Sequence, residues 1–249
     1  MVLRCRGMYQ EKDRIIMTKN TAEIEKFTSL ANSWWDVDGP FKTLHEINPT
    51  RLEYICNQIR KHIAREDISG VEILDIGCGG GIVSVPLARL GALVTGLDVG
   101  EENITVAKIY AQGEGLDIEY LSSDISDMHK KYDVVLCLEV VEHVDNLEEF
   151  LQNISHLLKP NGLIILSTIN RTMKAFALAV AAAEYILRWV PRGTHSFDKF
   201  VKPSELTNLL ETNHINVLDI KGMSYNILNR RWFLSNDIGV NYFLTGVNV

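Results

Sequence analysis

The stretch VEILDIGCGGGIVSVPLARL, residues 71–90, decides the fold class of this chain. Its apolar start predicts a buried strand at 73–77, and residues 81–90 predict the helix that follows it. Three consecutive glycines, 79–81, stand between the two elements. Glycine lets the backbone turn tightly and lets a ligand lie against bare main chain, and the first turn of a helix offers unpaired N–H groups. A simple strand-to-helix turn is the alternative, but the spacing of the glycines favours a nucleotide-binding loop.

The same order of strand, loop and helix repeats beyond this stretch. Short strands that alternate with helices indicate an α/β fold, with a mostly parallel sheet and helices on both faces. The predicted strands are 73–77, 93–98, 118–124, 132–140 and 162–168, followed by two closing strands at 215–223 and 240–249. The predicted helices of this part are 81–90, 101–112, 146–158 and 203–211. The sequence therefore predicts a seven-stranded sheet.

Two regions lie outside this alternation. Residues 21–31 and 50–66 predict N-terminal helices, because apolar residues recur in them at helical spacing. Turn-forming and aromatic residues between them predict a loop. After the fifth strand, residues 171–190 predict a long apolar helix, so we expect a helical insertion at about 171–200.

Length and composition bound the class of protein. The chain of 249 residues is long enough for one well-packed domain, which we expect over residues 21–249, with a disordered extension over 1–20. A formal net charge of −7 argues against a nucleic-acid partner. The four cysteines form no C-x-x-C pair, as is typical of reduced thiols in a cytosolic or matrix-like compartment. No apolar run reaches the roughly 18–20 residues that span a bilayer.

An acid ends each of the second and third predicted strands. Asp98 stands 21 residues after Gly77, where a carboxylate accepts hydrogen bonds from ribose hydroxyls. Its alternative role is to cap the next helix. Asp124 is expected near an adenine ring, or again as a cap. A dinucleotide fingerprint would need glycine where Ile82 stands, so the loop departs from that pattern.

Two carboxylates and an imidazole follow the fourth predicted strand, in CLEVVEHV (137–144). Ligands of open parallel sheets bind beyond the carboxyl ends of the strands, so Glu139, Glu142 and His143 are expected beside a substrate. Carboxylates with an imidazole suit Mg²⁺ or another divalent cation, which would lower the pKa of a bound phenol. Alternatively, His143 and Glu142 act as a catalytic general base, or they cap the following helix.

Several segments together resemble one family, the ubiquinone-biosynthesis O-methyltransferases of bacteria and mitochondria. This family belongs to the class I S-adenosylmethionine-dependent methyltransferases. The resemblance covers about residues 21–249, and the glycine loop alone would not make it specific. The segments that carry it are WWD (34–36), NPTR (48–51), LDIGCGGG (74–81), CLEVVEHV (137–144), STINRT (167–172) and GTH (193–195).

The resemblance implies a Rossmann-like fold, S-adenosylmethionine as methyl donor, and methylation of hydroxyls on 2-polyprenyl-6-hydroxyphenol and demethylubiquinol. It matches the family's metal positions to Glu139, Glu142 and His143. Where the family often has methionine, this chain has Leu138, a swap that keeps an apolar contact. The family's cofactor contacts fall on Arg51, Gly77, Asp98 and Leu138, and Asp75, Gly79 and Asp124 are expected to bind the cofactor from their places in the glycine loop and at the strand ends.

A polyprenyl substrate resides in a bilayer, so we expect residues 171–190 to lie on an anionic membrane surface. A packed core helix or a dimer interface is the alternative. The expected location is cytoplasmic, on the inner face of a bacterial membrane, or on the matrix side of a mitochondrial one. Other ubiquinone-biosynthesis proteins are expected as partners. The cations expected to face the lipid are Arg171, Lys174, Arg188 and Arg192.

Three further side chains have two interpretations each. Trp34 and Trp35 either cover the aromatic ring of a substrate or pack in the core. His195 either lies on the substrate side or supports a loop. Two other functions also stay open at this point: methylation of a different phenol, and a non-catalytic role in a biosynthetic complex. The intact glycine loop argues against the second.

Overall fold

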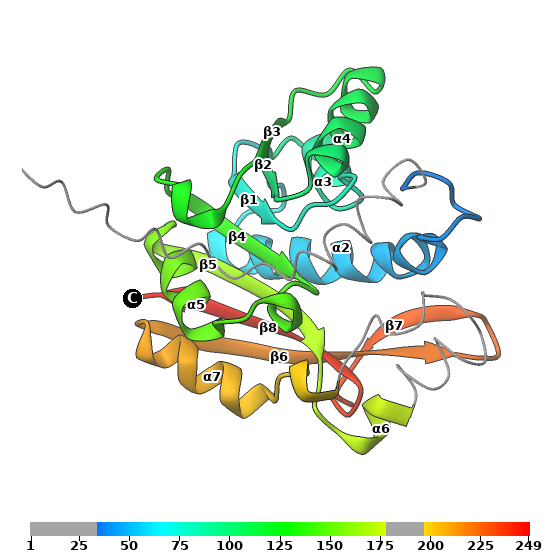
Figure 1. Cartoon of the computed structure of the whole chain (residues 1–249), viewed down its shortest axis with the longest axis vertical. Helices are drawn as coiled ribbons and strands as arrows, with labels where there is room; N and C mark the ends of the chain where they lie inside the picture. The colour runs from blue at the N-terminus through cyan, green and yellow to red at the C-terminus, as the bar shows by residue number, and fades with distance from the viewer. Residues whose placement is uncertain (1–33, 178–196) are drawn as a thin grey trace, which may run out of the picture.

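The computed structural model describes residues 34–177 and 197–249. At its centre is an eight-stranded sheet in the order β3-β2-β1-β4-β5-β8-β6-β7 (Figure 1). The parallel part comprises β1 (Glu72–Ile76), β2 (Leu93–Asp98), β3 (Glu119–Ser122), β4 (Tyr132–Leu138) and β5 (Leu158–Ile169). The antiparallel part comprises β6 (Ile215–Asn226), β7 (Arg231–Ser235) and β8 (Asn241–Asn248).

Helices cover both faces of the sheet, as predicted (Figure 1). Alternate residues of β4 show the two faces. Val134 and Leu136 pack in the cluster that includes α2, whereas Val135 and Cys137 pack in the cluster that includes α5 and α7. The described helices are α2 (Lys42–Ile63), α3 (Ser84–Arg89), α4 (Glu101–Gly113), α5 (Leu147–His156), α6 (Met173–Ala175) and α7 (Pro203–Thr212). The Rossmann-like α/β prediction is confirmed.

The prediction of seven strands is wrong by one, because β7 forms within the stretch between the two predicted closing strands. β7 pairs with β6 as an antiparallel hairpin, with Trp232 opposite Tyr225. Trp232, Phe233 and Leu234 are consecutive apolar residues, so the alternation that marks a half-buried strand is hidden. Trp232 and Leu234 pack against the cluster on the α2 face, which fixes the strand.

Two predicted helix starts are also wrong. The helix predicted at 50–66 begins at Lys42 and passes through Pro49, a residue that removes one helical hydrogen bond. Burial of one helix face outweighs this loss, and Asn48 donates a hydrogen bond of 2.8 Å to the carbonyl of Ile82. The helix predicted from residue 81 begins at Ser84, because Gly81 has a φ of +86° that no right-handed helix contains.

Some predictions fall outside the described residues. These are the extension over 1–20, the helix at 21–31, most of the helix at 171–190, and His195. Of the insertion, the structure describes residues 171–177, which include α6, and residues 197–200. No helix in the described ranges is long and apolar enough to cross a membrane.

Candidate active site

The glycine loop after β1 requires glycine at the predicted cofactor positions. Gly77 and Gly79 have φ values of +70° and +53°, a backbone conformation that costs free energy for residues other than glycine. A Cβ atom on Gly77 would lie 2.4 Å from Val140 Cγ2, and one on Gly79 would lie 2.5 Å from the ring of Trp34. The Gly79 N–H donates a hydrogen bond of 3.0 Å to Asp98. Bare main chain therefore lies between the ends of β1, β2 and β4.

Asp75 brings a buried carboxyl group to this loop. It is the fourth residue of β1, only 3% exposed, and accepts a hydrogen bond of 2.6 Å from Ser84 Oγ. Burial raises the pKa of Asp75 to about 6, although the Ser84 hydrogen bond and the charge of Arg51 act in the opposite direction. A cationic ligand placed here would favour the ionised carboxylate.

Asp98 ends β2 and connects the glycine loop to α4. Besides Gly79, its carboxylate accepts hydrogen bonds from Gly100 N at 2.8 Å and from Asn103 Nδ2 at 3.1 Å. The N-cap of α4 is Gly100, so Asp98 is not the capping residue that the alternative proposed. Burial raises the pKa of Asp98, while these hydrogen bonds lower it. The carboxylate is thus held in a fixed orientation at the carboxyl end of the strand.

Asp124 performs the structural role that was its alternative. Its carboxylate accepts a hydrogen bond of 3.0 Å from Ser126 N and caps the short 3₁₀ turn Ile125–Asp127. The turn follows β3, which pairs with β2, so Asp124 and Asp98 lie at the ends of neighbouring strands. Its contact with an adenine ring stays a prediction.

Arg51 and Glu139 form an ion pair that joins α2 to the end of β4. Arg51 is 4% exposed. Glu139 has a φ of +55°, a conformation that is uncommon for a residue other than glycine and that recurs at functional sites. Ser167 holds it there, since Glu139 N donates to the Ser167 carbonyl at 2.8 Å and Ser167 Oγ donates to the carboxylate at 3.3 Å. Leu138, beside it, packs against the cluster on the α2 face.

Glu142 and His143 lie in a 3₁₀ turn, Val141–His143, just beyond β4. The carboxyl group of Glu142 is buried and accepts a hydrogen bond of 2.7 Å from Thr168 Oγ1. Burial raises the pKa of Glu142, the charge of His143 lowers it, and the charge of Glu139 raises it. A carboxyl group with a raised pKa next to an imidazole is suited to accept and pass on a proton.

The structure does not assemble Glu139, Glu142 and His143 as a metal site. Across residues 34–177 and 197–249, no group of three or more His, Cys, Asp or Glu side chains is arranged to hold an ion. One reason is that Glu139 pairs with Arg51 and Glu142 with Thr168. The chemistry of the three donors still suits a hard divalent cation. Their role as metal ligands stays a prediction, and it requires Glu139 to turn away from Arg51.

Trp34 and Trp35 pack on the glycine loop, which agrees with the packing alternative. Trp34 stacks on Phe41 with ring centroids 3.8 Å apart, and its indole covers Gly79 and Gly80. Trp35 Nε1 donates a hydrogen bond of 2.8 Å to the Gly80 carbonyl. The aromatic pair thus forms one wall of the loop to which the cofactor is predicted to bind.

Sequence reasoning missed three polar residues of this site. Asn103 is 5% exposed and lies between Trp34 Nε1 and Asp98, with both hydrogen bonds at 3.1 Å. Ser167 and Thr168 hold the two glutamates after β4. The signal for the serine and threonine was available, because they stand in STINRT at the end of the neighbouring strand.

Known proteins resemble this chain over most of its length. The family model of a methyltransferase domain matches residues 49–220. A ubiquinone biosynthesis O-methyltransferase of Rickettsia felis is 49% identical over 224 residues, 89% of this chain and 91% of that protein. The mitochondrial ubiquinone biosynthesis O-methyltransferase of Arabidopsis thaliana is 45% identical over 91% of this chain and 74% of its own length.

A solved structure shows the same fold at low sequence identity. The magnesium protoporphyrin IX methyltransferase of Synechocystis PCC 6803 with bound SAH superposes with a TM-score of 0.66 at 21% identity, over 92% of this chain and 99% of that one. Together with the glycine loop and the acid after β2, this fold defines a class I S-adenosylmethionine-dependent methyltransferase. The relatives described above define the family within this class. The chain belongs to the ubiquinone biosynthesis O-methyltransferases.

Proposed function

We propose that the chain methylates the phenolic hydroxyls of 2-polyprenyl-6-hydroxyphenol and demethylubiquinol. The observation that carries the proposal is the pair formed by the buried Glu142 and the half-buried His143 beyond β4, next to the glycine loop. A phenol has an ordinary pKa near 10, so its oxygen needs a proton acceptor to become a good nucleophile at neutral pH. An O-methyltransferase of this family must therefore supply a group that accepts the phenol proton.

The transfer is a direct displacement. The phenol proton passes to the Glu142–His143 pair, and the phenolate oxygen attacks the methyl carbon of the sulfonium. The carbon–sulfur bond breaks, its electron pair stays on sulfur, and neutral S-adenosylhomocysteine leaves. The donor is already activated, so the protein contributes orientation, exclusion of water and proton transfer.

The glycine loop and its neighbours have matching roles toward S-adenosylmethionine. Asp75 is placed to stabilise the cationic methionine amine, because a buried carboxylate gains from a nearby positive charge. Asp98 is placed to accept hydrogen bonds from the ribose. The guanidinium of Arg51 can bind the methionine carboxylate, and Leu138 supplies an apolar contact at the rim.

A divalent cation, Mg²⁺ or another, completes the proposal, with Glu139, Glu142 and His143 as the residues that would hold it. When bound, such an ion lowers the pKa of a phenol and stabilises the phenolate. For this to occur Glu139 must leave Arg51, which frees the guanidinium for the cofactor carboxylate. The movement of Glu139 away from Arg51 therefore prepares both residues, Glu139 for the cation and Arg51 for the cofactor carboxylate.

The anionic membrane surface remains the proposed source of the substrate, with the chain on the cytoplasmic or matrix side. Two of the cations expected to face lipid are instead engaged within the protein. Arg171 pairs with Glu205 at 2.5 Å, and Lys174 pairs with Asp237 at 2.5 Å. Both pairs anchor the start of the insertion, so these two charges are not directed to lipid in this structure.

The test is a methyl-transfer assay with purified protein, S-adenosylmethionine and a short-chain 2-prenyl-6-hydroxyphenol dispersed in detergent. We expect a product heavier by one methylene unit in mass spectrometry, and a much slower reaction with unprenylated catechol as the matched substrate. Equal rates on both would favour the alternative of a general phenol methyltransferase. No product with either, from protein that binds S-adenosylmethionine, would favour the non-catalytic role.

A further inference from the structure

The turn between β6 and β7 exposes apolar side chains to solvent. Ile227 and Leu228 are 81% and 97% exposed, the two highest values among the large apolar residues of the described part of the chain. Tyr225 and Phe233, on the adjoining strands, are also exposed. Contiguous exposed apolar surface that is rimmed by polar residues is a feature of protein and membrane interaction sites.

This exposure belongs to an ordered turn. Asn226 Oδ1 accepts hydrogen bonds from Leu228 N at 2.9 Å and from Asn229 N at 3.3 Å, and Asn229 Oδ1 accepts one from Arg231 N at 3.2 Å. The strand pairing continues up to Asn226 opposite Arg231. The backbone is thus fixed by its own side chains, and Ile227 and Leu228 contribute little to the core.

The charge of the turn is opposite to that of the protein. Residues 225–233 contain Arg230 and Arg231 and no acid, in a chain of formal net charge −7. Both arginines are exposed, and neither forms an ion pair with another residue in the described ranges. Two aliphatic residues beside two cations match an anionic lipid surface, with an apolar layer beneath charged headgroups.

The turn lies on the active-site side of the sheet. β6 and β5 both run antiparallel to β8, so β6 runs in the same direction as β5 and ends at the same edge. Figure 1 shows the β6–β7 hairpin extending beyond the ends of β4 and β5 on that side. The turn therefore lies at the same edge of the sheet as Glu139, Glu142 and His143 at the end of β4. A membrane that contacts the turn would face this edge.

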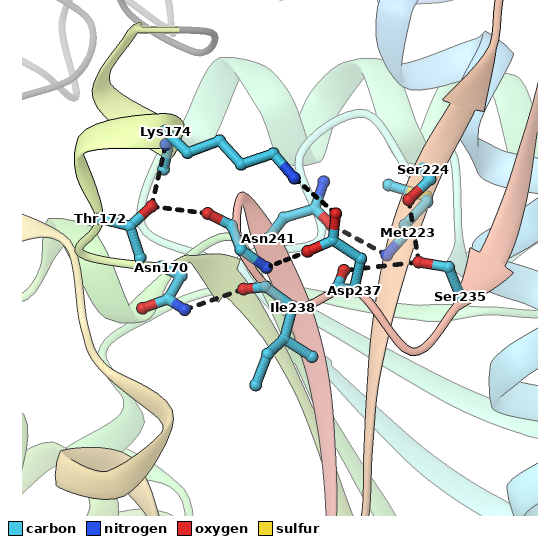
Figure 2. Close-up of polar contacts among 11 residues, drawn as sticks. Asn170, Thr172, Lys174, Met223, Ser224, Ser235, Asp237, Ile238 and Asn241 are labelled. Carbon is cyan, nitrogen blue, oxygen red and sulfur yellow. Dashed lines mark hydrogen bonds and ion pairs between the residues drawn. The ribbon is translucent and has the colours of Figure 1, made fainter.

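The hairpin is also joined to the start of the insertion, as Figure 2 shows. Lys174 pairs with Asp237, and Thr172 Oγ1 donates a hydrogen bond of 2.6 Å to the Gly239 carbonyl. Asn170 Nδ2 donates one of 2.8 Å to the Ile238 carbonyl. These contacts connect residues 170–175 to the link between β7 and β8, so the hairpin is held in a fixed position relative to α6.

We propose that the β6–β7 turn is a membrane-contact element, in which Ile227 and Leu228 enter the interface of an anionic bilayer and Arg230 and Arg231 bind lipid phosphates. The proposal rests on the proposed function in one respect, since a prenylated substrate explains why the active-site edge faces a bilayer. It adds a contact on the sheet itself, separate from the apolar segment 171–190.

Vesicle flotation of the full chain tests the turn directly. The wild type should float with vesicles containing anionic phosphatidylglycerol and much less with neutral phosphatidylcholine. The double variant Ile227→Ser/Leu228→Ser should bind at least about ten-fold more weakly, and Arg230→Gln/Arg231→Gln should lose the preference for anionic vesicles. The matched control is Ile109→Ser, which removes a 66% exposed residue of α4 and should bind as the wild type.

A second readout detects insertion even if residues 171–190 supply most of the affinity. An environment-sensitive dye on Leu228→Cys should shift to shorter wavelength when anionic vesicles are added, and the same dye on Ile109→Cys should not. Activity on a detergent-dispersed short-chain substrate should stay unchanged in the serine variant, which separates failure of the membrane contact from failure of the proposed function. Equal flotation of variant and wild type without a dye shift would overturn the proposal. So would conversion of a wild-type dimer to a monomer by the serine variant, which would assign the turn to self-association.

Discussion

Arg51 and Glu139 form an ion pair across 88 positions of the sequence, from α2 to the end of β4. The first is predicted to bind the cofactor carboxylate and the second a metal ion. Each therefore neutralises the other in a protein without ligands, which removes the cost of burying an unpaired guanidinium. If Arg51 binds the cofactor carboxylate as predicted, the pair must open, and the free energy of cofactor binding then includes the loss of this contact.

Replacing Glu139 with Gln should raise the affinity for S-adenosylhomocysteine, because Arg51 no longer has a competing carboxylate. We expect a gain of a few-fold, and we expect Arg51→Ala to lose about ten-fold or more through the missing charged hydrogen bonds. Calorimetric titration measures both, with Arg51→Lys as the control that keeps charge but not the bidentate fork. A weaker binding of the Gln variant would show that Glu139 supports the cofactor site and does not compete with it.

Asn103 should act on the cofactor through Asp98. Its amide donates to the Asp98 carboxylate while its oxygen accepts from Trp34 Nε1, so Asn103→Ala removes both hydrogen bonds. We expect the affinity for S-adenosylhomocysteine to fall about five- to thirty-fold, the range of one or two lost hydrogen bonds. The control is Thr105→Ala on the same helix, because the Thr105 hydroxyl donates only to the Glu101 carbonyl of its own helix. This variant should bind S-adenosylhomocysteine as the wild type does. Unchanged affinity of the Asn103 variant would restrict this residue to holding Trp34.

The fold could be predicted from the sequence where local patterns decide it. The five parallel strands follow apolar runs separated by helices, and the structure places all five as predicted within a few residues at each end. β7 was missed because Trp232, Phe233 and Leu234 show no alternation, and their burial depends on α2 packing against them. The early start of α2 was missed because Pro49 argues against a helix locally. Both errors come from tertiary packing that overrides a local preference.

The candidate site was predictable to the extent that it lies at strand ends. Asp75, Gly77, Asp98 and Glu139 lie in or directly after parallel strands, and such strands meet at one edge of the sheet. The partners of these residues were not predictable. For example, Arg51 contacts Glu139 from α2, and no sequence motif indicates where α2 packs on the sheet. The position of a residue in its strand is local information, whereas the pairing of two side chains depends on the whole fold.

Asp75 should make the stability of the cofactor-free protein depend on pH. Its pKa is raised to about 6 by burial, above the value near 3.9 in an unfolded chain. A raised folded-state pKa means that its contribution to stability is fully present below about pH 4 and is lost as the pH rises through about 6. Asp75→Asn cannot ionise, so its stability relative to the wild type should increase between these values by about 1–3 kcal/mol.

Urea unfolding at about pH 4 and at pH 7.5 measures this difference, with Asp133→Asn, which replaces a half-buried acid paired with Lys159, as the comparison. The same stability difference at both pH values would mean that Asp75 does not titrate as its burial implies. Adding S-adenosylhomocysteine should reduce the pH dependence, because the methionine amine would favour the ionised carboxylate.

Removal of divalent cations should separate the two roles assigned to Glu142 and His143. If they hold an ion with Glu139, wild-type protein treated with a chelator should lose most of its methyl-transfer activity and recover it with Mg²⁺. Its affinity for S-adenosylhomocysteine should fall by no more than a few-fold, because Asp75 and Asp98 do not depend on the ion, whereas Arg51 is again paired with Glu139 when the ion is removed. Glu142→Gln should show low activity that Mg²⁺ does not restore, and circular dichroism should confirm that it folds, since its amide oxygen can still accept from Thr168. Full activity of the chelated wild type, together with an inactive Glu142→Gln, would instead assign the pair to proton transfer without a metal ion.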